Sequence, residues 1–182
     1  MSPLSTPLGT DLTIIVDVAN VMGARADGWW KDRAAAAVRL RREVSALAER
    51  GLEVADLPRE ALGERPPDER CFPGWVLVLE GKARAAAAAD DGGPLVVAEP
   101  AQGTVSAEGS YGSRQIPADA VPLVRLVLAP GSGDDTLAEL AADLGGGRVV
   151  VTADRELRRR CEQAGAVVTG PRWLLELLKR VI

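Results

Sequence analysis

The sequence predicts an α/β domain built on a mainly parallel sheet. Two observations carry this prediction. Apolar runs of strand length alternate with helix-forming segments, and these runs lack the polar alternation of a sheet with one solvated face. A length of 182 residues suits a single domain, and a hydrophobic share of 47% is enough for a buried core. We therefore expect one domain whose central sheet is flanked by helices.

The first half of the chain is expected to form two strands joined by a long helix. Leu12–Val16 is a continuous apolar and β-branched run, after which Asp17–Asn20 lead into a glycine-containing loop. Trp30–Arg50 has helical apolar spacing and is followed by a terminating glycine. The polar, proline-bearing segment 53–73 is expected to be a loop with room for a short helical turn. Trp75–Leu79 then forms the second strand.

In the second half, helices and strands continue to alternate, as alanine content and apolar spacing indicate. The expected elements are a helix at Lys82–Ala89, a strand at Leu95–Ala98, a strand at Leu123–Leu128, a helix at Asp134–Leu144, a strand at Arg148–Val151, a helix at Asp154–Ala164, an edge strand at Ala166–Val168 and a last helix from Pro171 to near Ile182. Residues 1–11 are expected to be a flexible N-terminus, and the Gly-, Ser- and Pro-rich residues 100–122 a loop insertion.

The composition excludes several classes of site. With no histidine, the chain cannot form a Ser-His-Asp or Cys-His catalytic unit or a histidine-ligated zinc or haem site. Its two cysteines cannot form a four-thiolate zinc site. Any hydrolytic chemistry must therefore rest on carboxylates, with or without a hard metal ion.

Charge and cysteine content point to a soluble cytoplasmic protein. The formal net charge is −4, which does not suit a globally basic nucleic-acid coat, although local basic patches are compatible with it. Two distant cysteines do not make a disulfide framework. No apolar run approaches the roughly 20 residues of a membrane span, and the first ten residues lack the features of a signal peptide. We expect no membrane partner.

Acidic residues follow four of the predicted strands. They are Asp17, Glu80, the pair Asp134 and Asp135 after a glycine-rich turn, and Asp154. Because parallel strands point their carboxyl ends to the same edge of a sheet, these acids are expected to converge in one cleft. Clustered carboxylates need protons or cations to neutralise them, and Mg²⁺ and Mn²⁺ prefer oxygen ligands. An ion held there could activate water and stabilise charge on a phosphodiester.

Basic and aromatic side chains flank these acids. The basic residues are Arg25, Lys31 and Arg33 after the first acid, and Arg155, Arg158, Arg159 and Arg160 after the last. Such groups could hold RNA through its phosphates without reading sequence, although a solvated helix face is the simpler role for the second cluster. Trp29 and Trp30 could stack on unpaired bases, but such residues more often anchor a core, and at most one is expected to be exposed.

Three segments at strand ends carry a further signal. They read VDVANVMG at 16–23, GDDTL at 133–137 and VVTADREL at 150–157. In this order they resemble the three motifs of NYN-domain proteins, a family of PIN-like nucleases, and among these the bacterial YacP-like branch. The resemblance runs from about Leu12 to about Leu178. It implies a PIN-like three-layer domain that acts as a metal-dependent ribonuclease, with Mg²⁺ or Mn²⁺ as cofactor and RNA as partner.

The resemblance also implies roles for individual residues. Asp17, Asp134 and Asp154 match the metal-binding acids, Asn20 is the companion of the first acid, and Asp135 stands beside the second. We expect the first three to hold the metal directly or through water, and the other two to orient ligands or the attacking water.

Thr152 and Glu80 match less central positions of the pattern. Thr152 supports the last acid of the family. Glu80 departs from the family, whose members commonly carry aspartate there; it could still reach a metal through water, or it could be a solvated acid at a strand end.

Simpler roles and other functions compete with this hypothesis. Asp134 and Asp154 each stand where a helix begins and could serve as N-caps. The departure at Glu80 also suits a non-catalytic RNA-binding module with a degraded metal site. A haloacid-dehalogenase-type phosphatase would need a second acid where Ala19 stands. The apolar stripe of the last helix, which includes Trp173 and Leu174, suits either the core or a homodimer.

Overall fold

The computed structural model describes residues 12–64, 66, 68–88, 97–98 and 124–181. The predicted flexible N-terminus and the predicted loop insertion at 100–122 lie outside these residues. In the described part of the chain, no helix combines the length and apolar character that crossing a membrane requires.

Six strands form one sheet in which every neighbouring pair is parallel. In spatial order they are β5 (Val97–Ala98), β6 (Val124–Leu128), β4 (Gly74–Leu79), β1 (Leu12–Asp17), β7 (Gly147–Val151) and β8 (Val167–Thr169). The α/β class and the parallel sheet are therefore confirmed. Each strand agrees with a predicted one to within about two residues at its ends.

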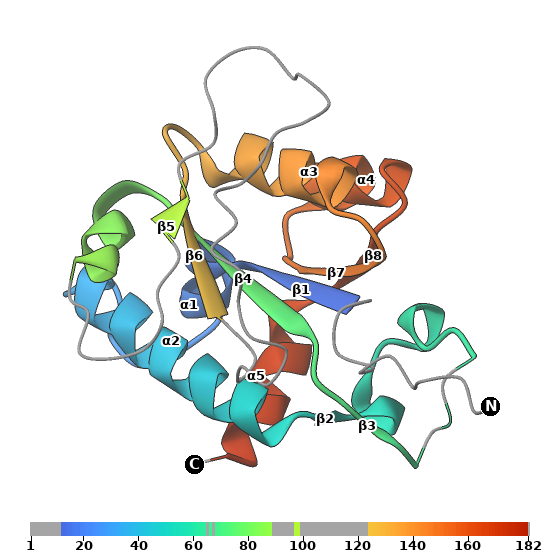
Figure 1. Cartoon of the computed structure of the whole chain (residues 1–182). Coiled ribbons are helices and arrows are strands. Elements are labelled where there is room, and N and C mark those ends of the chain that lie inside the picture. The colour runs from blue at the N-terminus through green and yellow to red at the C-terminus, as the bar shows by residue number, and fades with distance from the viewer. Residues whose placement is uncertain (1–11, 65, 67, 89–96, 99–123, 182) are drawn as a thin grey trace.

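Helices cover both faces of this sheet, which gives three layers (Figure 1). The α-helices are α1 (Val18–Gly23), α2 (Arg33–Arg50), α3 (Gly133–Asp143), α4 (Arg155–Gln163) and α5 (Pro171–Lys179), and the 3₁₀ helices are η1 (Val54–Asp56), η2 (Arg59–Ala61) and η3 (Gly81–Ala87). α1, α2, α5 and η3 pack on one face, and α3 and α4 on the other.

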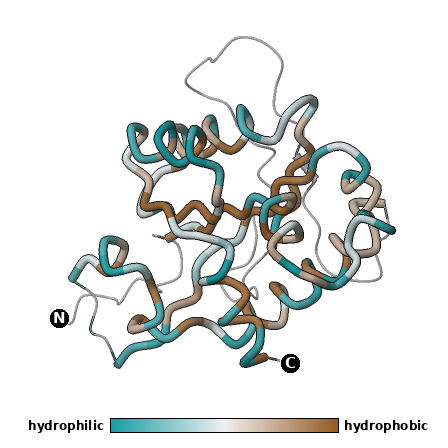
Figure 2. Tube along the Cα trace, turned by 180° about the vertical axis from the view of Figure 1, so that it is seen from behind, coloured by the Kyte–Doolittle hydropathy of each residue, from teal (hydrophilic) through white to brown (hydrophobic). Residues whose placement is uncertain are grey.

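The central strands are apolar throughout because both of their faces are buried. Ile14 and Val16 pack into the core under α2 and α5, whereas Ile15, between them, packs under α3 and α4. All three side chains are inaccessible to solvent. Figure 2 shows these hydrophobic strands running through the middle of the molecule, with the hydrophilic segments outside them. This two-sided burial is what a run without polar alternation predicts.

The sequence prediction was wrong at several places in the first half. The expected loop after Asp17 is the helix α1, whose Val18, Val21 and Met22 are buried at helical spacing. The long helix starts at Arg33 rather than Trp30, because the carboxylate of Asp32 accepts a hydrogen bond from the Ala35 amide (2.9 Å) and so caps it there.

The segment 53–73 and the helix after β4 also differ from expectation. The expected loop holds the short helical turns η1 and η2, for which the prediction left room. It also contributes to a second, antiparallel pair of strands that was not expected, β2 (Leu52–Glu53) and β3 (Arg70–Cys71). Strands of two residues leave no period to detect in a sequence. The predicted helix from Lys82 onwards is 3₁₀ in character.

The order of the strands places a crevice outside the carboxyl ends of β1 and β7, which are paired neighbours in the sheet. From β1 the chain adds β4 and β6 on one side, and after β6 it crosses to the other side of β1 to add β7 and β8. The winding direction thus reverses between β1 and β7. In open α/β sheets, ligands bind outside the carboxyl ends of the strands at such a switch point. The carboxyl ends of β1 and β7 are Asp17 and Val151.

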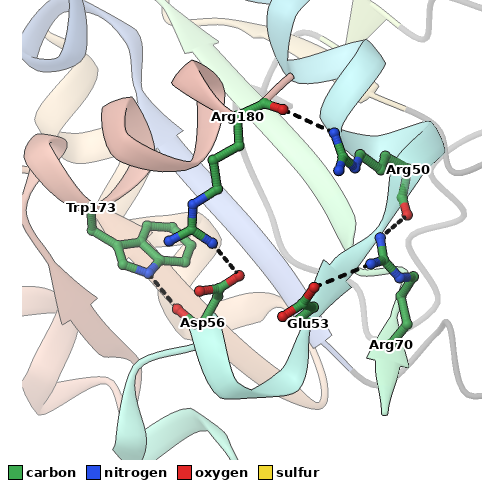
Figure 3. A network of polar contacts seen from close by, with 6 residues as sticks. All are labelled: Arg50, Glu53, Asp56, Arg70, Trp173 and Arg180. Atoms are coloured by element: carbon green, nitrogen blue, oxygen red, sulfur yellow. Dashed lines mark hydrogen bonds and ion pairs between the residues drawn. The ribbon is translucent and has the colours of Figure 1, made fainter. Parts of the chain in front are cut away.

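A polar network far from the crevice ties α5 to α2 and η1 (Figure 3). The indole of Trp173 donates to the Asp56 carbonyl (2.7 Å), and the Arg180 guanidinium donates to the Asp56 carboxylate (2.7 Å). Arg50 donates to the Arg180 carbonyl (2.9 Å), and Arg70 to the Arg50 carbonyl (2.8 Å). Carbonyls at helix C-termini lack partners within the helix, so these arginines satisfy acceptors that would otherwise need water.

The apolar stripe of α5 belongs to the core of the chain. Leu174, Leu177 and Leu178 are buried under the sheet, while Trp173 and Leu175 are partly buried against the same cluster. The core alternative for this stripe is therefore confirmed, and the homodimer stays a prediction.

Trp173→Phe tests the network. The change removes the indole donor and leaves most of the ring, so we expect a loss of about 1 kcal/mol in the free energy of unfolding, or roughly 2–4 °C in Tm. Urea denaturation and thermal unfolding measure it. Trp30→Phe is the control, because the Trp30 indole is exposed and makes no hydrogen bond with the described residues. Equal effects of the two variants would contradict a stabilising role for the Trp173 bond.

Candidate active site

Asp17 is a nearly buried carboxylate at the end of β1, 6% exposed. Its Oδ1 accepts a hydrogen bond from the Asn20 amide (3.0 Å), which caps α1, and its Oδ2 accepts one from the Thr152 hydroxyl (2.8 Å). Burial raises the pKa of Asp17 above its ordinary value, the two hydrogen bonds oppose this, and the charges of Asp134 and Glu80 add to the rise. The charged form is thus held in place but is energetically costly.

Two further hydrogen bonds hold the loop after β7, and one of them joins it to the first turn of α1. The amide oxygen of Asn20 accepts from the Ala153 backbone N–H (3.0 Å), and the Thr152 hydroxyl oxygen accepts from the Asp154 backbone N–H (3.2 Å). The first and third sequence motifs are therefore direct partners, and they meet at the carboxyl ends of β1 and β7.

Asp154 caps α4, as the simpler hypothesis for this residue predicts. Its Oδ1 accepts from the Leu157 amide (2.8 Å). Among the described residues, Oδ2 has no hydrogen-bond partner. Capping therefore uses one oxygen and leaves the other available to a ligand.

Asp134 lies in the first turn of α3 and does not cap it. Its side chain is exposed and makes no hydrogen bond within the described part of the chain. Partial desolvation raises its pKa, the negative charges of Asp154 and Glu80 raise it further, and Arg160 opposes the rise. These acids therefore lie close enough to repel one another, as the sequence predicted from their shared edge.

Glu80 supplies the cap that α3 lacks. Ser132, at the N-cap position, makes no side-chain cap, and the Glu80 carboxylate instead accepts a hydrogen bond from the Gly133 amide across the end of β4. A Cβ on Gly133 would lie 2.8 Å from Glu80 Oε2, so the glycine makes room for this contact. The alternative of a solvated acid at a strand end was wrong for Glu80, whose side chain is partly buried and bonded.

Asp135 points to a different partner. It forms an ion pair with Arg160 of α4 (2.9 Å), and its side chain is 73% exposed. The structure therefore brings Asp17, Glu80, Asp134 and Asp154 together and places Asp135 beside them.

The predicted basic residues fall into two situations. Arg25 forms a partly buried ion pair with Glu43, and Arg158 is half-buried. Lys31, Arg33 and Arg155 are exposed and have no carboxylate partner among the described residues. These three cations are free to meet an anion.

A groove of about 1040 Å³ adjoins the acids, and sequence reasoning did not find it. Asn20, Gly23 and Ala153 line one side, and Arg172 at the start of α5 lines the other. The groove depends on α1 packing against α5, and α1 was not predicted. Nothing in the sequence identified Arg172 as a groove residue, since it is one charged residue after a proline.

The donor set fits a hard divalent cation held partly through water. All candidate ligands are carboxylate oxygens, which Mg²⁺ and Mn²⁺ prefer. Burial is the main cause of the raised pKa of Asp17 and Asp134, and a cation would relieve the repulsion that adds to it. In the described part of the chain, no three acidic side chains form a ready-made cage for an ion. Mg²⁺ commonly keeps several waters and uses one or two carboxylates, which suits this spacing.

Comparison with known proteins shows the fold. No family model matches the sequence, and no curated protein does. The chain is similar in structure to a mutant of Rae1 (YacP) from Bacillus subtilis, with a TM-score of 0.55 and 12% sequence identity over 93% of this chain and 76% of that one. At this identity the likeness is one of fold, and it agrees with the α/β architecture of the parallel sheet and its flanking helices.

Asp17→Asn should stabilise the protein at neutral pH. Burial and neighbouring charges raise the pKa of Asp17 in the folded protein. The stability that its protonated form contributes is therefore fully present below the pKa of the unfolded state, and it is lost as pH rises through the pKa of the folded state. Asparagine lacks the charge and can still accept from the Asn20 amide.

We therefore expect the variant to gain unfolding free energy over the wild type, and the gain to be larger at pH 7 than at pH 4. Each kcal/mol corresponds to roughly 2–4 °C in Tm. Asp135→Asn, at an exposed acid, is the control and should change the unfolding free energy by less than about 0.5 kcal/mol. A loss of stability in Asp17→Asn at pH 7 would show that its hydrogen bonds outweigh its burial.

Gly133→Ala should displace the Glu80 carboxylate and remove the cap of α3. We expect a loss of about 1 kcal/mol in unfolding free energy. Adding Glu80→Ala should cost less than the sum of the single changes, because both remove the same contact. Gly131→Ala is the control, since a Cβ there meets nothing within 4 Å. Additive effects of the two changes would refute the coupling.

Proposed function

We propose that this chain is a metal-dependent ribonuclease that hydrolyses RNA phosphodiester bonds at the carboxyl edge of its sheet. The observation that carries the proposal is the set of acids at the switch point. Asp17 is buried and fixed by two hydrogen bonds, while Asp134 and Asp154 keep carboxylate oxygens without partners among the described residues. Mutually repelling carboxylates in such a crevice suit a cation better than an apolar or anionic ligand.

Two independent lines support the same family. The motifs resemble those of the YacP-like branch of NYN-domain proteins, and the fold is similar to that of a protein named YacP. The first and third motif segments also meet in space, through the Asp17–Thr152 and Asn20–Ala153 hydrogen bonds. A chance resemblance to the family gives no reason for the motifs to be hydrogen-bonded to each other in the folded chain.

The acids take the roles of metal ligands and of groups that orient them. Asp17, Asp134 and Asp154 would hold Mg²⁺ or Mn²⁺ directly or through water. A bound ion of this kind supplies a Lewis acid that lowers the pKa of water and stabilises charge on a phosphate. Asn20 fixes the loop that carries Asp154, and Asp135 orients the site through its ion pair with Arg160.

Other residues position these acids or hold the substrate. Thr152 restrains the Asp17 carboxylate, and Glu80 holds the first turn of α3, where Asp134 lies. Phosphates on either side of the scissile bond would meet the basic residues. These are Arg25, Lys31, Arg33, Arg155 and Arg158.

A second candidate function is an RNA-binding module that does not cleave. The observation that favours it is that, within the described ranges, no three acids form a ready-made metal cage. Such a protein would bind RNA with a steep salt dependence and would not respond to divalent cations.

Cleavage of labelled RNA, with EDTA or with Mn²⁺ or Mg²⁺, tests the first proposal. We expect cleavage only with metal, and a loss on the order of 100-fold or more in Asp17→Asn, Asp134→Asn and Asp154→Asn, because each removes a charge that would hold the ion. Asp143→Asn, at the far end of α3, should retain activity. Unchanged cleavage in Asp17→Asn would refute the assignment.

Thermal unfolding with Mn²⁺ separates the two candidates. Metal at about 100 times its Kd should stabilise the wild type by roughly 2.7 kcal/mol and should stabilise Asp134→Asn much less. RNA binding without any stabilisation by metal would favour the non-catalytic module.

A further inference from the structure

An exposed tryptophan precedes α2, outside the acidic crevice. Trp30 is 59% exposed, and within the described part of the chain Phe72 (40%) is the only other large hydrophobic side chain that is exposed. The core does not need Trp30, because the aromatic residue beside it, Trp29, already packs on the core cluster. The prediction that at most one of these two tryptophans is exposed is confirmed.

Trp29 holds Trp30 in a defined orientation. The two ring centroids are 6.3 Å apart and their planes are at 87°, which is the preferred edge-to-face arrangement of aromatic rings. Trp29 is in turn covered by the guanidinium of Arg33, 5.3 Å from its ring centroid. A turn with Gly28 at φ +78° and a Lys31 N–H to Gly28 carbonyl bond (3.0 Å) fixes the backbone. Trp30 is therefore exposed to solvent, and its ring is oriented by its contact with Trp29.

Two exposed cations follow this ring in the chain. Lys31 and Arg33 are exposed, and neither has a carboxylate partner among the described residues. Two acids lie in the same segment: Asp27 accepts from the Trp29 amide (3.2 Å) and pairs with Arg39, and Asp32 caps α2 through the Ala35 amide. An open aromatic surface beside cations that have no ion-pair partner suits a ligand that has both a π-face and anionic groups.

We propose that Trp29, Trp30, Lys31 and Arg33 form a platform that binds an unpaired nucleotide of RNA. The base stacks on Trp30, and the adjoining phosphates meet Lys31 and Arg33. Bases inside an A-form helix are stacked on their neighbours, so they cannot offer a free face. The inference rests on the proposed function and narrows its substrate to RNA that is single-stranded beside the cleavage site.

The platform lies within reach of the acids. Trp29 packs beside Gly23, since a Cβ on Gly23 would lie 3.9 Å from its ring, and Gly23 lines the groove together with Asn20 and Ala153. Asp17 caps the start of α1, and Gly23 ends this helix of six residues, so α1 separates the two by about 9 Å. A single strand spans that distance in a few nucleotides.

Binding measured in EDTA tests the platform without any cleavage. The probes are a fluorescein-labelled unpaired oligoribonucleotide and a blunt RNA duplex that contains the same strand. Trp30→Ala should weaken binding of the unpaired probe by about 5- to 30-fold and binding of the duplex by less than about 2-fold. Trp30→Phe, which keeps a π-face, should stay within about 3-fold of the wild type.

Two further variants serve as control and as a test of charge. Phe72→Ala removes the other aromatic side chain that is exposed among the described residues, next to Cys71 of β3, and should leave both affinities unchanged. Lys31→Gln should reduce the slope of log K against log salt for the unpaired probe by about 0.7, the value for one phosphate contact to a single strand.

Distinct results would overturn the inference. An equal loss on both probes, or no loss, in Trp30→Ala would rule out base stacking. Self-association in sedimentation that Trp30→Ala abolishes would make the ring an interface between copies of this chain. Because the binding assay contains no metal, a protein that never cleaves RNA can still bind RNA through the platform. Conversely, if cleavage is lost in Asp17→Asn but binding is unchanged in Trp30→Ala, the inference fails and the proposed function stands.

Discussion

The hydrogen bond between Asp17 and Thr152 is the contact on which the rest of the crevice depends. It joins residues 135 positions apart and links the carboxyl ends of the neighbouring strands β1 and β7, where the winding of the sheet reverses. Through it, the carboxylate that caps α1 also orients the loop that leads into α4. The contact has a cost, since burial raises the pKa of Asp17 and makes its charged form unfavourable. A residue chosen for stability alone would not be an ionised acid at this position.

The fold offsets part of this cost through its helix termini. In a parallel sheet, the helices that follow the strands start at the carboxyl edge, so α1, α3 and α4 all begin beside the acids. Unpaired N–H groups and the positive ends of helix dipoles favour negative charge there. Asp17 and Asp154 each use one oxygen to cap a helix. In Asp154, capping leaves the second carboxylate oxygen without a partner among the described residues, so capping and the proposed metal site are compatible.

Much of the fold and the set of acids could be predicted from the sequence, and the pairings could not. The long strands can be identified in the sequence because burial of both faces makes them continuously apolar. In a parallel sheet their carboxyl ends lie at one edge whatever the strand order. Which acid meets which partner depends on that order. Nothing local links Asp17 to Thr152, Glu80 to Gly133 or Asp135 to Arg160. The helix α1 was missed for a different reason, since six residues are too few to show a helical period.

The glutamate at position 80, where the family that the motifs resemble commonly has aspartate, has a physical consequence for Asp134. The Glu80 side chain reaches from the end of β4 to the Gly133 amide, and the absence of a Cβ on Gly133 makes that approach possible. With this amide satisfied from another strand and Ser132 making no cap, α3 does not need its own first-turn acid as a cap. Asp134 therefore keeps its carboxylate exposed beside Asp154, where Arg160 offsets only part of the effects that raise its pKa. The longer side chain at position 80 thus leaves Asp134 without a capping role, which is how Glu80 would contribute to the proposed metal site.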